Sequence, residues 1–116
     1  TGGVVGINGV SAFLDDTATS AESIATHVDH VAQLVGPEHV ALGLDYVVSG
    51  ADLAANFASS AAFWPAWFGY GDDMRFACPD RIADVAAALR RRGYDERSLG
   101  SILGGNLRRV AQAVWA

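Results

Sequence analysis

Asp45 is the residue whose type and position in this sequence best suit it to chemistry. It directly follows the apolar run Val40–Leu44, which lacks polar alternation and is typical of a strand covered on both faces. Parallel α/β folds assemble their active sites at the C-terminal ends of such strands. Partial burial there would perturb the pKa of the carboxyl group and suit it to proton transfer or metal contact. The pattern alone favours the competing interpretation, an aspartate that caps the next turn.

His27, Asp29 and His30 form a second candidate set, because residues three apart share one helical face and imidazole is a common zinc ligand. Position argues against this metal site. Val28 belongs to the apolar stripe of the same segment, and the exposed side of the segment offers no third obvious ligand. We therefore interpret both histidines, and His39 just before a strand, as structural or solvent-exposed, and we expect no metal ligands in this chain.

Two further motifs that often carry chemistry are missing. The glycines near the start lie before or within an apolar segment, whereas a dinucleotide fingerprint needs its glycines between a strand and a helix. No serine lies in a nucleophile-elbow context. The sequence therefore supports neither a phosphate cradle nor a Ser-His-Asp arrangement.

Three predicted elements would position Asp45: a strand, a helix and a second strand. Residues 4–8 resemble a buried strand, and their apolar start without a polar lead-in is typical of a cut edge. A capping box at residues 19–22 and apolar residues spaced four, three and four predict a helix from Ser20 to Val35, which Gly36 and Pro37 end. With the strand at 40–44 this makes a parallel βαβ unit, and the class is α/β.

The C-terminal third predicts three more helices. Asp80 is expected to cap the first, which ends at Gly93 after three arginines at 90–92 that we interpret as a solvated helix end. Asp95 and Asn106 are expected to cap two short helices separated by Gly104 and Gly105. In the last helix the apolar residues are expected to face the core; they are Leu107, Val110 and Val114.

A long stretch between Tyr46 and Pro79 has weak periodicity and holds most of the chain's aromatic residues. Loops of this length are usually lids or binding loops. The alternative is that the rings merely pack the loop onto the domain.

Composition limits the classes of function. The 116 residues are 51% hydrophobic and 18% charged, which is typical of a chain that buries a core. A net charge of -5 offers no extended basic surface, so nucleic acid is not expected as a partner. No apolar stretch is long enough for a membrane span, the lone Cys78 cannot form an internal disulfide, and we expect a soluble, cytoplasmic protein.

Four segments in this order carry a family resemblance: GGVVGIN at 2–8, HVDHV at 27–31, VALGLDY at 40–46 and ILGGNLRRV at 102–110. The set resembles the last third of membrane (renal) dipeptidases, peptidase family M19, from Gly2 to Trp115, and weakens between Val47 and Pro79. The resemblance implies a metal-dependent (β/α)8 TIM barrel of the amidohydrolase type. Residues 4–8 then resemble the seventh strand and residues 40–44 the eighth. Because such barrels need about 250 residues, residues 1–116 are expected to be an incomplete domain: about the last two βα units plus terminal helices.

The resemblance also implies a chemistry. Family members hydrolyse dipeptides with two zinc ions bridged by a hydroxide, and take the ligands from earlier strands that this chain lacks. Asp45 matches the family's proton-handling aspartate. Phe13 stands where many members bind substrate through a tyrosine hydroxyl, and it keeps the ring without that donor. Tyr46 is the other expected substrate contact. Val47 replaces a second aspartate that members often carry, which puts the substrate preference in question.

The expected partners are a dipeptide substrate, the N-terminal remainder of the same barrel and a second copy in a homodimer. Two functions from other classes stay open. In the first alternative, the chain is a non-catalytic structural or assembly segment. In the second, it is a small-molecule-binding α/β module that uses its aromatic loop without chemistry.

Overall fold

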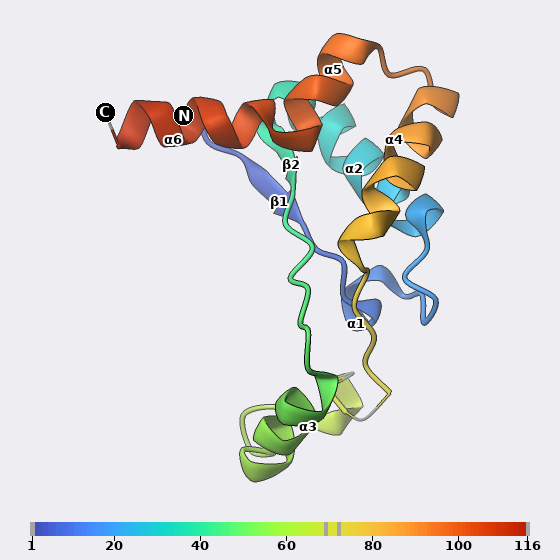
Figure 1. Cartoon of the computed structure of the whole chain (residues 1–116), viewed down its shortest axis with the longest axis vertical. Helices are drawn as coiled ribbons and strands as arrows, with labels where there is room; N and C mark the ends of the chain where they lie inside the picture. The colour runs from blue at the N-terminus through green and yellow to red at the C-terminus, as the bar shows by residue number, and fades with distance from the viewer. Residues whose placement is uncertain (1, 69, 72, 116) are drawn as a thin grey trace.

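The computed structural model describes residues 2–68, 70–71 and 73–115 and shows a small parallel sheet with helices packed against it (Figure 1). Strand β1 (Val5–Ile7) pairs with β2 (Val40–Leu42), with Gly6 opposite Ala41. Helix α2 (Ala21–Val35) connects them. The α/β class and the parallel βαβ unit are thus confirmed, although both strands are shorter than expected. Val40 and Ala41 are fully buried, whereas Gly43 beyond the strand is exposed.

The start of α2 differs in detail from the expected capping box. The hydroxyl of Ser20 accepts from the Ser23 amide at 3.2 Å and caps the helix. Thr19 lies one residue before the cap; it is buried and has a left-handed φ of 47°. Gly36 ends the helix at a φ of 92°, which favours glycine, and a 3₁₀ turn at Pro37–His39 leads into β2.

Helix α2 lies between the sheet and helix α4 (Ile82–Arg91), and this is where the core sits (Figure 1). Ile24 and Val28 of α2 and Leu89 of α4 are fully buried. Asp80 does not cap α4. It lies in a 3₁₀ turn, Pro79–Arg81, that precedes the helix, and no side chain caps the helix itself.

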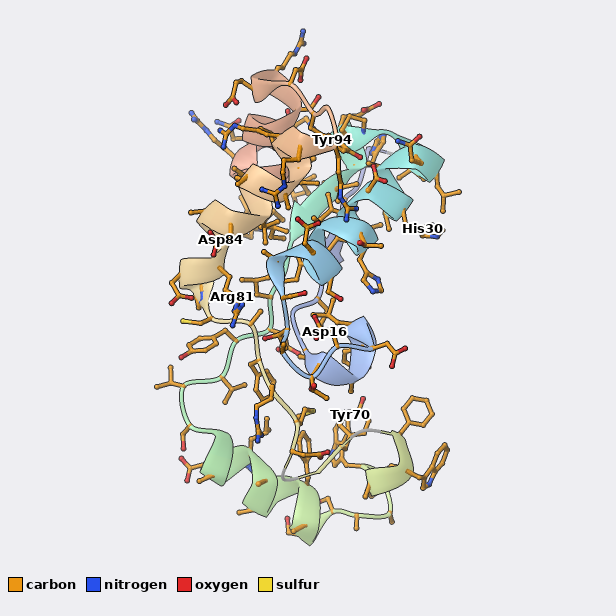
Figure 2. All side chains as sticks on the ribbon, turned by 90° about the vertical axis from the view of Figure 1, so that its right-hand side faces the viewer. Asp16, His30, Tyr70, Arg81, Asp84 and Tyr94 are labelled. Carbon is orange, nitrogen blue, oxygen red and sulfur yellow. The ribbon has the colours of Figure 1, made fainter. Side chains whose placement is uncertain are left out.

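Polar contacts connect the C-terminal end of α4 to the exposed side of α2. The guanidinium groups of Arg91 and Arg92 both bind the Glu22 carboxylate, which lowers the pKa of Glu22. Tyr94 donates its hydroxyl to Asp29 at 2.8 Å (Figure 2), and partial burial together with this contact raises the pKa of Tyr94 to about 12. Both arginines are exposed, as the solvated helix end predicts, and they are in addition ion-paired.

Arg90 is likewise exposed, and it binds Glu96 through two hydrogen bonds. Glu96 begins helix α5 (Glu96–Gly100), where Asp95 accepts from the Ser98 amide and confirms its expected role as a cap. A wide π-helical turn, Ser101–Gly105, follows and contains the break at Gly104.

Asn106 is the first residue of helix α6 (Asn106–Val114), and its expected role as a cap was wrong. Its side chain is buried, with 4% exposed, and points back to the chain before and in β2. The amide nitrogen donates to the carbonyl oxygens of Pro37 and Val40, both at 2.8 Å. Asn106 therefore ties the C-terminal helices to β2.

The apolar stripe of α6 does not face the core. Leu107 is 46% exposed and Val114 69% exposed, and α6 projects from the body of the chain beside its two termini (Figure 1). The predicted orientation is therefore wrong in this chain. On the polar side of α6, Arg109 donates to the carbonyl oxygens of Gly2 and Glu38.

The stretch after β2 is more regular than expected. It contains helix α3 (Gly50–Ser59), which Ser49 caps, and a 3₁₀ turn at Ala66–Phe68. We call residues 46–74 the aromatic lobe; it lies apart from the packed helices, below the short helix α1 (Ser11–Leu14) in Figure 1. Within the described residues, no helix has the length and apolarity to cross a bilayer.

Replacement of Asn106 by alanine should lower the free energy of unfolding by about 2–4 kcal/mol, because two carbonyl groups lose their buried donor. Urea unfolding of the variant in complex with the N-terminal remainder that the resemblance implies measures this. Asn56→Ala, at an exposed position in α3, is the matched control and should change the value by less than about 0.5 kcal/mol. Equal effects of the two variants would contradict the role of Asn106.

Candidate functional site

The chains that leave β1 and β2 stay paired beyond the strands. The Gly43 amide donates to the Ile7 carbonyl oxygen at 2.9 Å, and the Gly9 amide donates to the Leu44 carbonyl oxygen at 3.1 Å. These two hydrogen bonds continue the parallel ladder to its C-terminal end. The side chains that follow each strand therefore emerge next to one another.

Asp45 lies at this end of the sheet, as the sequence predicts. Its backbone is left-handed, with a φ of 56°, a conformation that aspartate and asparagine adopt more readily than other non-glycine residues. The side chain is exposed, so the expected partial burial is absent from this chain. Its carboxylate Oδ2 lies 3.5 Å from Nδ2 of Asn8, the residue that follows β1.

Phe13 lies in α1, a few residues beyond β1, and is 44% exposed. Its ring makes an edge contact with Tyr70, with the ring centroids 6.3 Å apart. Tyr46 directly follows Asp45 and is 43% exposed. Phe13 therefore contacts the aromatic lobe. Tyr46 is placed near Asp45 only by being the next residue in the chain.

Tyr70 is the centre of the aromatic lobe, and Figure 2 shows it between α3 and α1. Its ring contacts Trp64 at 5.0 Å and Phe57 at 5.4 Å between centroids, and stacks on Phe68 at 6.3 Å. Other rings of the lobe remain open to solvent; Phe63 is 82% and Trp67 81% exposed. Ring packing and an exposed aromatic surface therefore coexist in this segment.

The lobe returns to the body next to the chain that leaves β1. Ser11 binds Arg75 twice, since its amide donates to the Arg75 carbonyl and its hydroxyl accepts from the Arg75 amide, both at 2.9 Å. The Ala77 amide donates to the Gly9 carbonyl at 2.8 Å. Gly9 is thus held between Leu44 on one side and Ala77 on the other.

The donors of this chain do not fit a metal centre. Among the described residues, no group of three or more His, Cys, Asp or Glu side chains is placed to hold a metal ion. Asp29, beside His27 and His30, accepts from Tyr94 and Gln33 instead. His39 binds the Gly3 carbonyl oxygen through Nδ1 at 2.8 Å, so that nitrogen carries the proton.

The family model of membrane dipeptidases, peptidase family M19, matches residues 1–60, which include β1, α2, β2 and Asp45. The chain belongs to the membrane dipeptidase family. Two curated proteins are similar to this M19 chain, and one of them is named a dipeptidase. A protein of Klebsiella pneumoniae named for its place in the pqqA 5' region is 32% identical, over 99% of this chain and 36% of that protein. Dipeptidase verJ of Clonostachys rogersoniana is 29% identical, over 97% of this chain and 24% of that protein.

This M19 chain therefore spans only about a third or less of the length of these curated relatives. No solved structure matches it significantly. The family resemblance is confirmed. The roles of Asp45, Phe13 and Tyr46 remain predictions.

Sequence reasoning missed several contacts around this site. It gave Asn8 no role, because the contact with Asp45 follows from the pairing of the two strands and no local motif marks it. The contact of Phe13 with Tyr70 joins residues far apart in the chain, and local patterns carry no information on it. The same holds for the pairing of Ser11 with Arg75.

Gly9→Ala should destabilise the protein by about 1–3 kcal/mol, because the new Cβ would lie 2.9 Å from both the Ala77 Cβ and the Leu44 carbonyl oxygen. Thermal unfolding of the chain in complex with the same N-terminal remainder measures the loss. Gly50→Ala is the matched control: nothing lies within 4 Å of its Cβ, and alanine favours the helix that it begins. A Gly9 variant as stable as the Gly50 variant would contradict the close packing at this junction.

Proposed function

We propose that this chain is the C-terminal segment of a zinc-dependent dipeptidase and that it supplies the acid/base residue Asp45. The observation that carries the proposal is the place of Asp45. It is a solvent-accessible carboxylate at the C-terminal end of a parallel strand, within the part of the chain that matches the family. Active sites of parallel α/β folds form at this edge.

The proposed architecture is a TIM barrel of which β1 and β2 are the last two strands. Two strands cannot close a barrel, and the apolar surfaces left open support a missing remainder. Val5 of β1 is 48% exposed, and a hollow of about 470 Å³ beside it is lined by Val4, Val35 and His39 among others. The exposed stripe of α6 adds to this surface. The N-terminal part of the barrel is the partner that these surfaces fit.

The proposed reaction is hydrolysis of a dipeptide. The C–N bond breaks, the carbonyl carbon gains a hydroxyl group from water and the leaving nitrogen gains a hydrogen. Asp45 holds the proton released by water on a carboxylate oxygen and passes it to the nitrogen. Phe13 and Tyr46, which are exposed near the same strand ends, contact the substrate.

The aromatic lobe covers the substrate in this proposal. Edge contact between Phe13 and Tyr70 connects the lobe to the proposed substrate contact, and its exposed rings offer apolar surface. A cover of this kind excludes water and strengthens electrostatic interactions inside the site. The family implies two zinc ions, but the donors of this chain do not fit them, so the proposal assigns all metal ligands to the remainder of the barrel.

Co-expression with the N-terminal part of the barrel tests the proposed architecture. The chain alone should aggregate because its strand edges and apolar faces are open, and the two parts together should purify as a one-to-one complex. Val5→Lys should weaken the complex, whereas Val48→Lys, at a valine 89% exposed in the lobe, should not. A monodisperse chain that unfolds cooperatively by itself would contradict the proposal.

Asp45→Asn in the active enzyme should lower kcat for a dipeptide by about 100-fold or more, because asparagine cannot carry the proton. Steady-state hydrolysis measures the change, and zinc analysis of the same samples shows whether the metal content is equal. Asp84→Asn, at an exposed position in α4 (Figure 2), is the matched control and should keep normal turnover. Near-normal turnover of the Asp45 variant would refute the assignment and favour a non-catalytic segment.

A further inference from the structure

The geometry points to Asn8 as a positioning residue for Asp45. This inference rests on the proposed function, since it concerns the carboxylate to which that function assigns the proton transfer. Asn8 directly follows β1 and Asp45 follows β2 after two residues, so both leave the sheet at the same edge. No motif assigned a role to Asn8, and it is the contact itself that indicates one.

The orientation of the Asn8 amide is fixed by its own backbone. Its Oδ1 accepts from the Val10 amide at 2.6 Å, an Asx turn that only an oxygen can make, because the partner is a donor. The other end of the planar amide must then be Nδ2, with its two hydrogens. Nδ2 is the atom that lies 3.5 Å from Oδ2 of Asp45.

The backbones that carry the two side chains are held together independently of this contact. The bonds from Gly43 to Ile7 and from Gly9 to Leu44 connect the two segments on either side of the pair. A separation of 3.5 Å is at the long end of the hydrogen-bond range, so the contact orients the carboxylate weakly in this chain.

Asp45 has little else to restrain it. The side chain is exposed, and the described residues include no ion pair to it. A neutral amide donor on Oδ2 restricts the rotation of the carboxylate and leaves Oδ1 free to exchange a proton with the substrate. Orientation of a reacting group in this way contributes to the rate without contact between Asn8 and the substrate.

Two substitutions separate the parts of this role. Asn8→Ala removes both the turn and the donor. Asn8→Asp keeps an oxygen for the Val10 amide and replaces the donor by a second negative charge beside Asp45. In the active enzyme, Asn8→Ala should lower kcat about tenfold with KM within a factor of two. Asn8→Asp should raise the acidic limb of the profile of kcat/KM against pH by about one unit, because like charges disfavour ionisation.

Gln112→Glu is the matched amide-to-carboxylate control, at an exposed position of α6, and should leave the pH profile unchanged. The decisive measurement repeats Asn8→Ala in the Asp45→Asn background. If Asn8 acts through Asp45, the second substitution should cause no further loss of kcat. Thermal unfolding of the Asn8→Ala enzyme itself should remain cooperative and begin well above the assay temperature, which excludes misfolding as the cause of its lower kcat.

Three negative results are distinguishable. Normal turnover of Asp45→Asn would refute the proposed function and the inference with it. If Asp45→Asn is inactive but both Asn8 variants show the wild-type kcat and pH profile, the role of Asn8 alone is refuted. A full tenfold loss from Asn8→Ala in the Asp45→Asn background would also overturn it, since Asn8 would then act independently of Asp45.

Discussion

The parallel pairing of β1 with β2, extended by the bond between Gly9 and Leu44, is the interaction on which the arrangement of this chain depends. It puts the two strand ends at one edge and so brings Asn8 next to Asp45. The same backbone of Gly9 accepts from Ala77 and thereby fixes where the aromatic lobe returns. A side chain at Gly9 would disturb both contacts, because there is no room for a Cβ atom.

Around this sheet the chain has two kinds of surface. One side is a packed core in which α2 covers the strands and α4 covers α2, with polar bonds from Arg91, Arg92 and Tyr94 at its open end. The other side is apolar and open, along β1 and along α6. Open apolar surface of this extent is costly in water, and in the proposed architecture the N-terminal part of the barrel packs there.

The C-terminal helices illustrate how a polar residue can serve packing. The Asn106 amide donates to the carbonyl oxygens of Pro37 and Val40 at the start of β2. Arg109 donates to the carbonyl oxygens of Gly2 and Glu38. These contacts hold α6 against β2, although Leu107 and Val114 of its apolar stripe stay exposed in the described part of the chain. They connect residues 66 to 107 positions apart in the sequence.

The sequence by itself determined the α/β class, the parallel βαβ unit and the place of Asp45 at a strand end, because apolar periodicity and turn residues are local signals. The family followed from the resemblance of four ordered segments. Only the tertiary structure decided which polar side chains meet. Asparagine is a common helix cap, but the side chain of Asn106 donates to the Val40 carbonyl oxygen in β2. The cap of α2 is Ser20 and not Thr19. The pairing of Asn8 with Asp45 depends on the strand register, a long-range property that the local pattern does not encode.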